Sequence, residues 1–132
     1  MPSEDPKAVL RRWYDEMWSQ KNGDLILELV GPAYVRHEMG GTRSVTPQEY
    51  CEQTKGFMQQ VEISDMRYSL VAEGDKVCAI GTWKVNGKQW DWVQVFRVSG
   101  GRLVETWLSG IGMESNWTAD VYQHLSPVIE PV

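Results

Sequence analysis

The sequence contains only two cysteines, Cys51 and Cys78, among 132 residues. Two thiols without metal-type spacing provide neither a disulfide framework nor a zinc site, so we expect free thiols in a reducing compartment. Long apolar runs are also missing, and residues 1–6 lack the basic and then apolar pattern of a signal peptide. These absences predict a cytoplasmic protein without a membrane-spanning segment.

Positive charge is scarce as well. The chain has 13 Lys and Arg against 18 Asp and Glu, which gives a net charge of −5, and its basic residues form no run. The electrostatic footprint that nucleic acid or an anionic membrane surface requires is therefore missing. We expect neither nucleic acid nor a membrane as a partner.

Tryptophan, by contrast, is abundant, with seven residues in a chain whose length fits one domain. Trp is costly to bury because its indole N–H needs a hydrogen-bond partner. Seven of them therefore suggest a large core, a ligand pocket or an interface. We expect a single domain over residues 1–132, with its core at about residues 5–112 and a weakly specified C-terminal tail.

Start signals and helical spacing predict three helices in the first half of the chain. Asp5 opens the first one, and Asp24 can cap a short second one that ends before Gly31. Thr46 and Glu49 form a capping box that opens the third. The first helix carries an aromatic and apolar stripe, made of Val9, Leu10, Trp13, Tyr14, Met17 and Trp18.

The rest of the chain is predicted to form strands. Residues 33–38 form a short strand, followed by a polar loop over 40–44. From Met66 onward the pattern alternates between apolar and polar residues, which is typical of strands. Three turn signals divide this region into the four strands of an antiparallel meander: Glu73-Gly74-Asp75-Lys76, Asn86-Gly87 and Gly100-Gly101.

The turns predict the register of these strands. A two-residue loop at Asn86-Gly87 places three pairs opposite each other: Trp83 and Trp90, Gly81 and Trp92, Ala79 and Gln94. Two-residue loops at the other two turns would pair Met66 with Trp83, Tyr68 with Gly81, Leu70 with Ala79, Gln94 with Trp107, Phe96 with Glu105 and Trp92 with Ser109.

This register gathers most of the large aromatic residues of the sheet on one face, together with two polar residues. The small residues Ala79 and Gly81 leave space there, and Gly81 can also bend the sheet. Because ligand pockets are mostly apolar with a few aimed polar groups, we expect a small-molecule site. The face carries Met66, Tyr68, Leu70, Ala79, Gly81, Trp83, Trp90, Trp92, Gln94, Glu105, Trp107, Ser109 and Ile111.

The opposite face is too apolar to be fully solvated. The three helices can cover only one face, so we expect the second face to pack against another copy of the chain in a homodimer. Its apolar residues are Cys78, Ile80, Val93, Val95, Val104 and Leu108.

Four stretches resemble the SnoaL-like polyketide cyclase family over about residues 8–112: Trp13-Tyr14-Asp15-Glu16-Met17-Trp18 before Asp24, Tyr34-Val35-Arg36-His37-Glu38, Val71-Ala72-Glu73-Gly74-Asp75-Lys76-Val77, and Phe96-Arg97-Val98-Ser99-Gly100-Gly101-Arg102-Leu103-Val104-Glu105-Thr106-Trp107. The resemblance implies an α+β fold, a cone-shaped barrel of helices packed on a curved antiparallel sheet, shared with nuclear transport factor 2 and ketosteroid isomerase. This fold hosts many functions. The chain departs from the family at Ile111, where an acidic residue is usual, and at Leu108, which is often Asp.

The resemblance implies proton transfer on a carbonyl compound without a cofactor, which needs an acid or base in a dry pocket. His37 and Glu105 are the candidate catalytic pair. An ordinary strand-end His and a Glu paired with an Arg are the alternatives. The residues expected to bind the substrate are Tyr68, Trp83, Trp90, Trp92, Gln94, Trp107, Tyr14 and Trp18.

Three functions fit these residues. The first is a cyclase or isomerase acting on a polyketide-like or polycyclic natural-product intermediate. The second is a non-catalytic ligand-binding or dimerisation module, which Ile111 favours. The third is an epoxide hydrolase or dehydratase, for which Asp91 is predicted on the wrong face. Metal binding is not expected, because neighbours such as His37 and Glu38 point to opposite faces of a strand.

Overall fold

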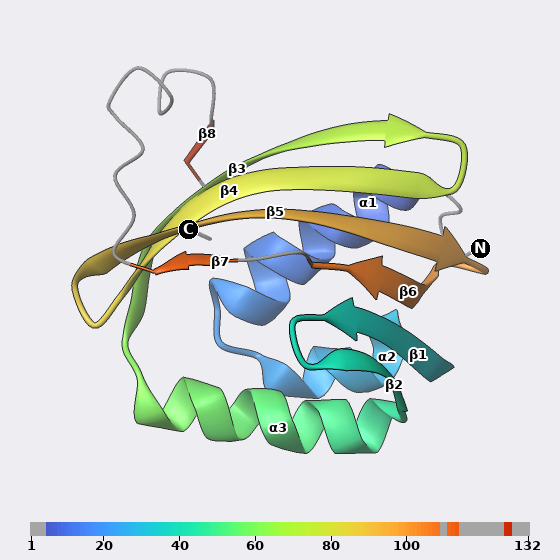
Figure 1. The fold of residues 1–132 in the computed structure, drawn as a ribbon, viewed down its shortest axis with the longest axis horizontal. Helices are drawn as coiled ribbons and strands as arrows, with labels where there is room; N and C mark the ends of the chain where they lie inside the picture. The colour runs from blue at the N-terminus through green and yellow to red at the C-terminus, as the bar shows by residue number, and fades with distance from the viewer. Residues whose placement is uncertain (1–4, 109–110, 114–125, 128–132) are drawn as a thin grey trace.

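A curved sheet packs against helices on its concave side in the computed structural model, which describes residues 5–108, 111–113 and 126–127 (Figure 1). The strands lie in the order β2-β1-β6-β5-β4-β3-β8, and β7 pairs with β5. Their bounds are β1 (Val30–Glu38), β2 (Gly41–Val45), β3 (Ile63–Glu73), β4 (Lys76–Val85), β5 (Lys88–Ser99), β6 (Arg102–Trp107), β7 (Ile111–Met113) and β8 (Ser126–Pro127).

The α+β class predicted from the sequence is confirmed, with two differences in the sheet. The sheet is mixed, because β1 runs parallel to β6 while the other pairs of described strands are antiparallel. It is strongly curved but does not close into a barrel, since β2 and β8 end the row of strands.

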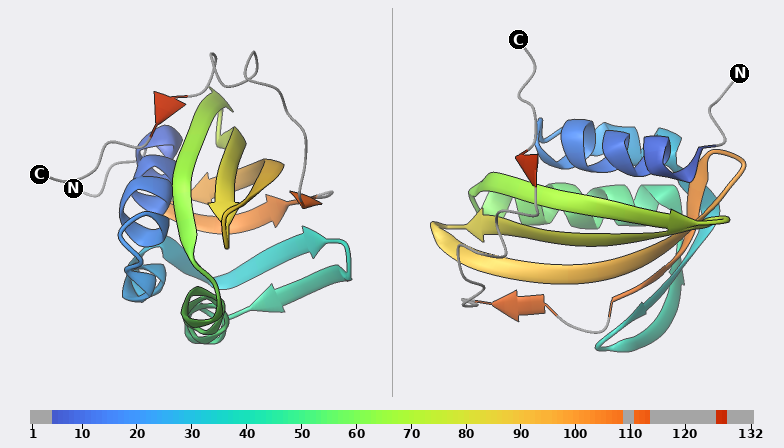
Figure 2. Two further views of the ribbon diagram at one scale, coloured as in Figure 1. Left: turned by 90° about the vertical axis from the view of Figure 1, so that its left-hand side faces the viewer. Right: turned by 90° about the horizontal axis from the view of Figure 1, so that it is seen from above.

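The helical segments lie inside the curve of the sheet (Figure 2). They are α1 (Pro6–Arg12), the π-helix η1 (Trp13–Trp18), the 3₁₀ turn η2 (Gly23–Leu25), α2 (Ile26–Leu29) and α3 (Pro47–Gln60). The first of them contacts β3, β4 and β5, and α3 contacts β1. None of the helices among the described residues has the length and apolar character needed to cross a membrane.

The first helix is not uniform, although its spacing predicts one α-helix. Beyond Arg12 the hydrogen bonds widen to the π pattern: the Ser19 N–H donates to the Tyr14 carbonyl at 3.1 Å and the Asn22 N–H to the Met17 carbonyl at 2.9 Å. Tyr14 and Trp18, four positions apart in this wider turn, both contact indoles of the sheet.

The start of α3 agrees with the prediction, whereas the segments before it differ. The Thr46 hydroxyl accepts from the Glu49 N–H, and the Glu49 carboxylate accepts from the Thr46 N–H, both at 3.1 Å. Asp24 caps no helix but pairs with Lys55 at 2.9 Å. A loop is predicted over residues 40–44, but residues 41–45 form the edge strand β2, because the chain reverses tightly after β1 and the backbone of β1 pairs with them.

The register of β4 and β5 is the predicted one. Trp83 lies opposite Trp90, Gly81 opposite Trp92 and Ala79 opposite Gln94. Asn86 and Gly87 both have positive φ, as a two-residue loop of this type requires. The predicted pairs of Tyr68 with Gly81 and Leu70 with Ala79 are also present, but the register breaks between Ser64 and Arg67, so Met66 does not pair with Trp83.

The predicted register of β6 is wrong beyond its first two residues. The turn after Ser99 is correct, because Ser99 lies opposite Arg102. The register then shifts between Arg97 and Val98, and one extra residue in β6 reverses the side chains that follow.

As a result, Glu105 lies opposite Arg97 instead of Phe96, and Trp107 opposite Val95 instead of Gln94. Both therefore point to the outer face of the sheet, away from the indoles. Trp92 pairs with Ile111, while its predicted partner Ser109 lies outside the described residues.

The indole of Trp92 lies directly on the backbone of Gly81. A Cβ added at Gly81 would lie 2.2 Å from Cζ2 of Trp92. The space that the sequence predicts beside Trp92 is thus occupied by the indole itself. Only glycine allows this close approach of ring and strand.

We predict that Gly81→Ala lowers the free energy of unfolding by about 1–3 kcal/mol, because the new methyl group displaces Trp92. Urea unfolding measures the change. Gly56→Ala in α3 is the matched control. Nothing lies within 4 Å of the Cβ that it would add, and alanine in a helix interior is favoured over glycine by about 1 kcal/mol. If both variants stabilise the protein, Trp92 does not rest on Gly81.

Candidate functional site

The helices and the concave face of the sheet enclose a cavity of about 250 Å³, here called the interior cavity. Eight of its twelve lining residues are aromatic. The residues that line it are Trp13, Tyr14, Trp18, Arg36, Glu38, Tyr50, Phe57, Trp83, Trp90, Trp92, Gln94 and Leu108.

Ring contacts hold the aromatic wall of the interior cavity in place. The Tyr14 ring stacks on Trp92 with centroids 5.0 Å apart, and Trp18 meets Trp83 edge-on at 5.1 Å. Within the described part of the chain, the Tyr14 hydroxyl and the indole nitrogens of Trp83 and Trp92 are buried without a hydrogen-bond partner. These three donors have no acceptor within reach among the described residues of the wall, and an unpaired buried donor costs free energy.

An ion pair on β1 forms the polar part of the cavity wall. Arg36 and Glu38 are two positions apart, so both side chains point to the inner face of the strand. The Arg36 Nη2 donates to Glu38 Oε2 at 2.9 Å. Its guanidinium group lies 4.5 Å from the ring centroid of Tyr50 and 5.3 Å from that of Tyr34. A buried cation is thus held by one carboxylate and two aromatic rings.

Glu38 is ionised at neutral pH in this environment. Burial of the carboxylate raises its pKa. The hydrogen bonds and positive charges of Arg36 and Arg43 lower the pKa by more than burial raises it, so the net pKa of Glu38 lies below its usual value. The Arg43 Nε donates to Glu38 Oε1 at 2.9 Å. Tyr14 shows the opposite effect, since its complete burial raises the pKa of the phenol well above 10.

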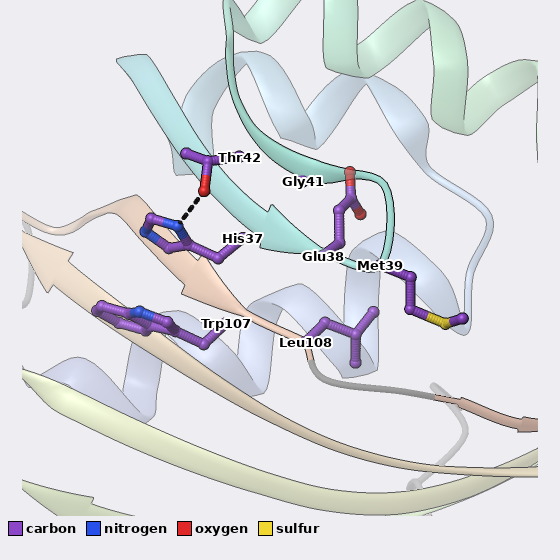
Figure 3. Close-up of a pocket in the computed structure, with 7 residues that line it drawn as sticks. All are labelled: His37, Glu38, Met39, Gly41, Thr42, Trp107 and Leu108. Carbon is purple, nitrogen blue, oxygen red and sulfur yellow. Dashed lines mark hydrogen bonds between the residues drawn. The ribbon is translucent and has the colours of Figure 1, made fainter.

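A second cavity, here called the outer hollow, lies at the tip of the β1–β2 hairpin and measures about 300 Å³ (Figure 3). The His37 and Trp107 rings stack on one side of it with centroids 5.4 Å apart. Glu38 and Leu108 line both cavities. The residues that line the outer hollow are His37, Glu38, Met39, Gly41, Thr42, Trp107 and Leu108.

His37 is fixed between two polar partners at this site. Its Nδ1 lies 2.8 Å from the Thr42 hydroxyl and its Nε2 lies 2.7 Å from Glu105 Oε2. Arg97 donates to the other oxygen of Glu105 at 3.1 Å. The hydrogen bond with His37 is the main reason that the pKa of Glu105 is lowered; burial opposes it, and Arg97 adds to the lowering.

The structure therefore separates the ten site residues predicted from the sequence. Four of them do not line the interior cavity. His37 and Glu105 bond to each other on the outer face, Trp107 lies beside them, and the Tyr68 hydroxyl donates to Asp15 at 2.6 Å. The six that do line it are Tyr14, Trp18, Trp83, Trp90, Trp92 and Gln94.

Sequence reasoning missed the charged part of the interior cavity. Arg36 and Glu38 belong to the predicted strand 33–38, and its period of two places them on the face opposite His37. The alternation of side chains along this strand is the sequence signal that could have placed Arg36 and Glu38 on the inner face. Leu108, predicted on the outer face, lines both cavities, because the shift in β6 reverses it too.

No cluster of three or more His, Cys, Asp or Glu residues that could hold a metal occurs among the residues that the structure describes. Cys51 is buried, Cys78 is partly buried, and both are free thiols.

A curved sheet that wraps around helices and encloses a cavity defines the α+β class of nuclear transport factor 2-like proteins. The sequence profile of the SnoaL-like domain matches residues 10–106. The chain belongs to this family of SnoaL-like domains, as the sequence resemblance predicts.

Solved structures show the same fold at low sequence identity. A candidate polyketide cyclase from Acidithiobacillus ferrooxidans is 21% identical with a TM-score of 0.71, and the match covers 94% of this chain and 95% of that one. IdmH, a candidate polyketide cyclase from Streptomyces antibioticus, is 18% identical with a TM-score of 0.65, covering 79% and 90%.

A candidate ketosteroid isomerase from Kribbella flavida is 10% identical with a TM-score of 0.68, and the match covers 88% of this chain and 82% of that one. No curated protein sequence matches this chain. At these identities the similarity shows the fold, and the chemistry must be argued from the site.

We predict that Glu38→Gln lowers the free energy of unfolding at pH 7 by about 1–3 kcal/mol, since it removes charged hydrogen bonds to Arg36 and Arg43. The folded-state pKa of Glu38 is lowered. Its contribution is therefore complete above the unfolded-state pKa of about 4.3 and is lost as the pH falls through the lower folded-state pKa.

Urea unfolding from pH 7 down to pH 3 measures this difference, which is expected to shrink below about pH 4. The exposed Glu52 provides the control, because Glu52→Gln should change stability by less than about 0.5 kcal/mol throughout. A difference for Glu38→Gln that is as large at pH 3 as at pH 7 would show that the ion pair is not its source.

Proposed function

We propose that this protein is a cofactor-independent cyclase or isomerase that acts on a carbonyl-containing, polyketide-like intermediate of natural-product biosynthesis. One observation carries the proposal: an ion pair between the buried Arg36 and the partly buried Glu38 lines an interior cavity whose other walls are mainly aromatic. Flat rings stack on such walls, and a carbonyl oxygen supplies an acceptor for the buried donors of the wall that have no partner among the described residues.

The pair can perform the proton transfer that such a reaction requires. Glu38 removes a proton from the carbon beside the carbonyl, and the electrons move to the carbonyl oxygen as an enolate. Arg36 stabilises the negative charge because a guanidinium ion stays protonated and donates hydrogen bonds. In a cyclase the enolate carbon attacks a second carbonyl carbon, and the alkoxide that forms takes the proton back from Glu38. In an isomerase that acts on a β,γ-unsaturated ketone, the dienolate takes this proton from Glu38 at its γ carbon.

A carboxylate with an ordinary or lowered pKa can serve as this base. Carboxylate bases of nearly normal pKa work where a strong donor stabilises the enolate oxygen. Protons between two carbonyl groups, as in polyketides, are also more acidic than those beside one. Gln94 is held by the Thr106 hydroxyl at 2.9 Å, so its amide can orient the second carbonyl.

The same electrostatics support a second candidate, a non-catalytic module that binds small molecules. The pKa of Glu38 is lowered and that of Tyr14 is raised, so neither group titrates near neutral pH. General acid–base catalysis is most efficient when the pKa lies near the working pH.

The catalytic roles predicted from the sequence for His37 and Glu105 stay predictions. The two side chains form a hydrogen-bonded pair, but they line the outer face and not the interior cavity. A role in catalysis would require the reacting part of the substrate to extend into the outer hollow.

We further propose that the protein forms a homodimer through the outer face of the sheet. Val71 is 60% exposed and Val93 is 46% exposed, and both lie on this face. Cys78, Ile80 and Val95 around them are partly buried. Such a patch on a sheet face favours association.

We predict that Glu38→Gln lowers the rate of proton exchange at C1 of 2-tetralone, a flat bicyclic ketone, by about 100-fold or more. Nuclear magnetic resonance follows the exchange in D₂O, and the binding of 2-tetralone should persist. Glu52→Gln is the control and should exchange at the parent rate. Binding without exchange in the parent would favour the non-catalytic module.

The same assay on His37→Gln and Glu105→Gln tests the pair predicted from the sequence. Exchange that is lost in these two variants and kept in Glu38→Gln would move the catalytic base to the outer hollow and contradict the proposed mechanism.

We predict that Val93→Lys and Val71→Lys convert the dimer to a monomer in sedimentation velocity experiments, because a charge on the patch prevents its burial. Leu27→Lys is the matched control, since Leu27 is 44% exposed but lies on α2. A monomeric parent protein, or a dimer that withstands both substitutions, would refute this interface.

A further inference from the structure

The interior cavity is small for the substrate class that the proposed function assigns to it. Pockets that take drug-sized ligands measure roughly 300–1,000 Å³. The interior cavity measures about 250 Å³ and the outer hollow about 300 Å³. Each alone lies at or below the lower limit of that range, whereas the two together lie well within it.

The two cavities meet at the same two side chains. Glu38 and Leu108 line both of them, one from β1 and the other from the end of β6. The Leu108 backbone is held against β1, because its N–H donates to the His37 carbonyl at 2.8 Å. Leu108 thus stands as an apolar partition between the cavities, and Glu38 forms their common polar wall.

The outer hollow has the features of a binding site in its own right. The His37 and Trp107 rings are stacked on each other, with an angle of 19° between their planes, and this stack forms one side of the hollow (Figure 3). Met39, which is 85% exposed, supplies an adaptable apolar side chain. The Thr42 hydroxyl, bonded to His37, can accept a further hydrogen bond.

We propose that the interior cavity and the outer hollow form one elongated substrate site, divided by Leu108. The substrate is a flat carbonyl compound of three or more rings. Its reactive carbonyl lies at Arg36 and Glu38, and its far ring passes Leu108 and packs against the His37–Trp107 stack. This inference rests on the proposed function and adds the length of the substrate and the residues that select for it.

Two ketones that differ by one ring test the elongated site. The short probe is 2-acetylnaphthalene, and the extended probe is 2-acetyl-6-phenylnaphthalene. Titrations that follow the fluorescence of each probe give both dissociation constants. The extended probe is expected to bind the parent protein about tenfold more tightly, because its phenyl ring packs against the His37–Trp107 stack.

Variants of the outer hollow should remove this preference. Thr42→Tyr fills the hollow from the exposed strand β2, and Trp107→Ala removes one ring of the His37–Trp107 stack. In both, the two dissociation constants should become equal within about threefold while the short probe binds as in the parent. Ser44→Tyr makes the same change two positions along β2 from Thr42, at a residue outside the hollow, and should keep the preference. Thermal unfolding verifies the fold of each variant. If only one of Thr42→Tyr and Trp107→Ala folds, that variant alone still tests the elongated site.

The outcomes separate the two proposals. A parent protein that binds both probes equally, or a preference that survives Thr42→Tyr and Trp107→Ala, would overturn the elongated site and leave the proposed function standing. A parent protein that binds neither probe would overturn both. An effect of Ser44→Tyr as large as that of Thr42→Tyr would also count against the outer hollow.

Discussion

The contact between the Trp92 indole and the backbone of Gly81 is the constraint on which the cavity depends. It brings a large ring flat against the middle of β4, where a side chain would hold it away. Tyr14 stacks on the same ring, and this stack, together with the contact of Trp18 with Trp83, positions the π-helix η1 on the sheet. The interior cavity lies beside this stack, and its shape follows from the absence of a side chain at Gly81.

The polar part of the site depends on a different strand. On β1, alternate residues send Arg36 and Glu38 inward and His37 outward, so neighbouring positions serve two cavities. The buried guanidinium is stabilised by a carboxylate and by aromatic rings, and neither interaction requires water. A cation that is held in this way is ready to stabilise a developing negative charge, because no solvent must be reorganised when the charge appears.

The sequence predicts this architecture where a local signal determines geometry. Asn86 and Gly87 allow one turn type, so the register of β4 and β5 and the inward position of Gln94 follow from two residues. The extra residue in β6 gives no comparable signal, because a bulge depends on pairing with β1 and β5 together. Glu105 was therefore assigned to the wrong face. The partnership of Arg36 with Tyr50 arises from tertiary packing that no periodicity reveals.

The parallel pairing of β1 with β6 has a consequence for the order of folding. Val35 lies beside Glu105 in this pair, although 70 positions separate them in the chain. The β3–β4–β5 meander pairs strands that follow each other in the chain and can form early, whereas pairing over such a distance has a large cost in loop-closure entropy and is slow. We therefore expect the strand that carries Arg36 and Glu38 to dock late, so that the indoles of a partly folded chain assemble before the ion pair joins them.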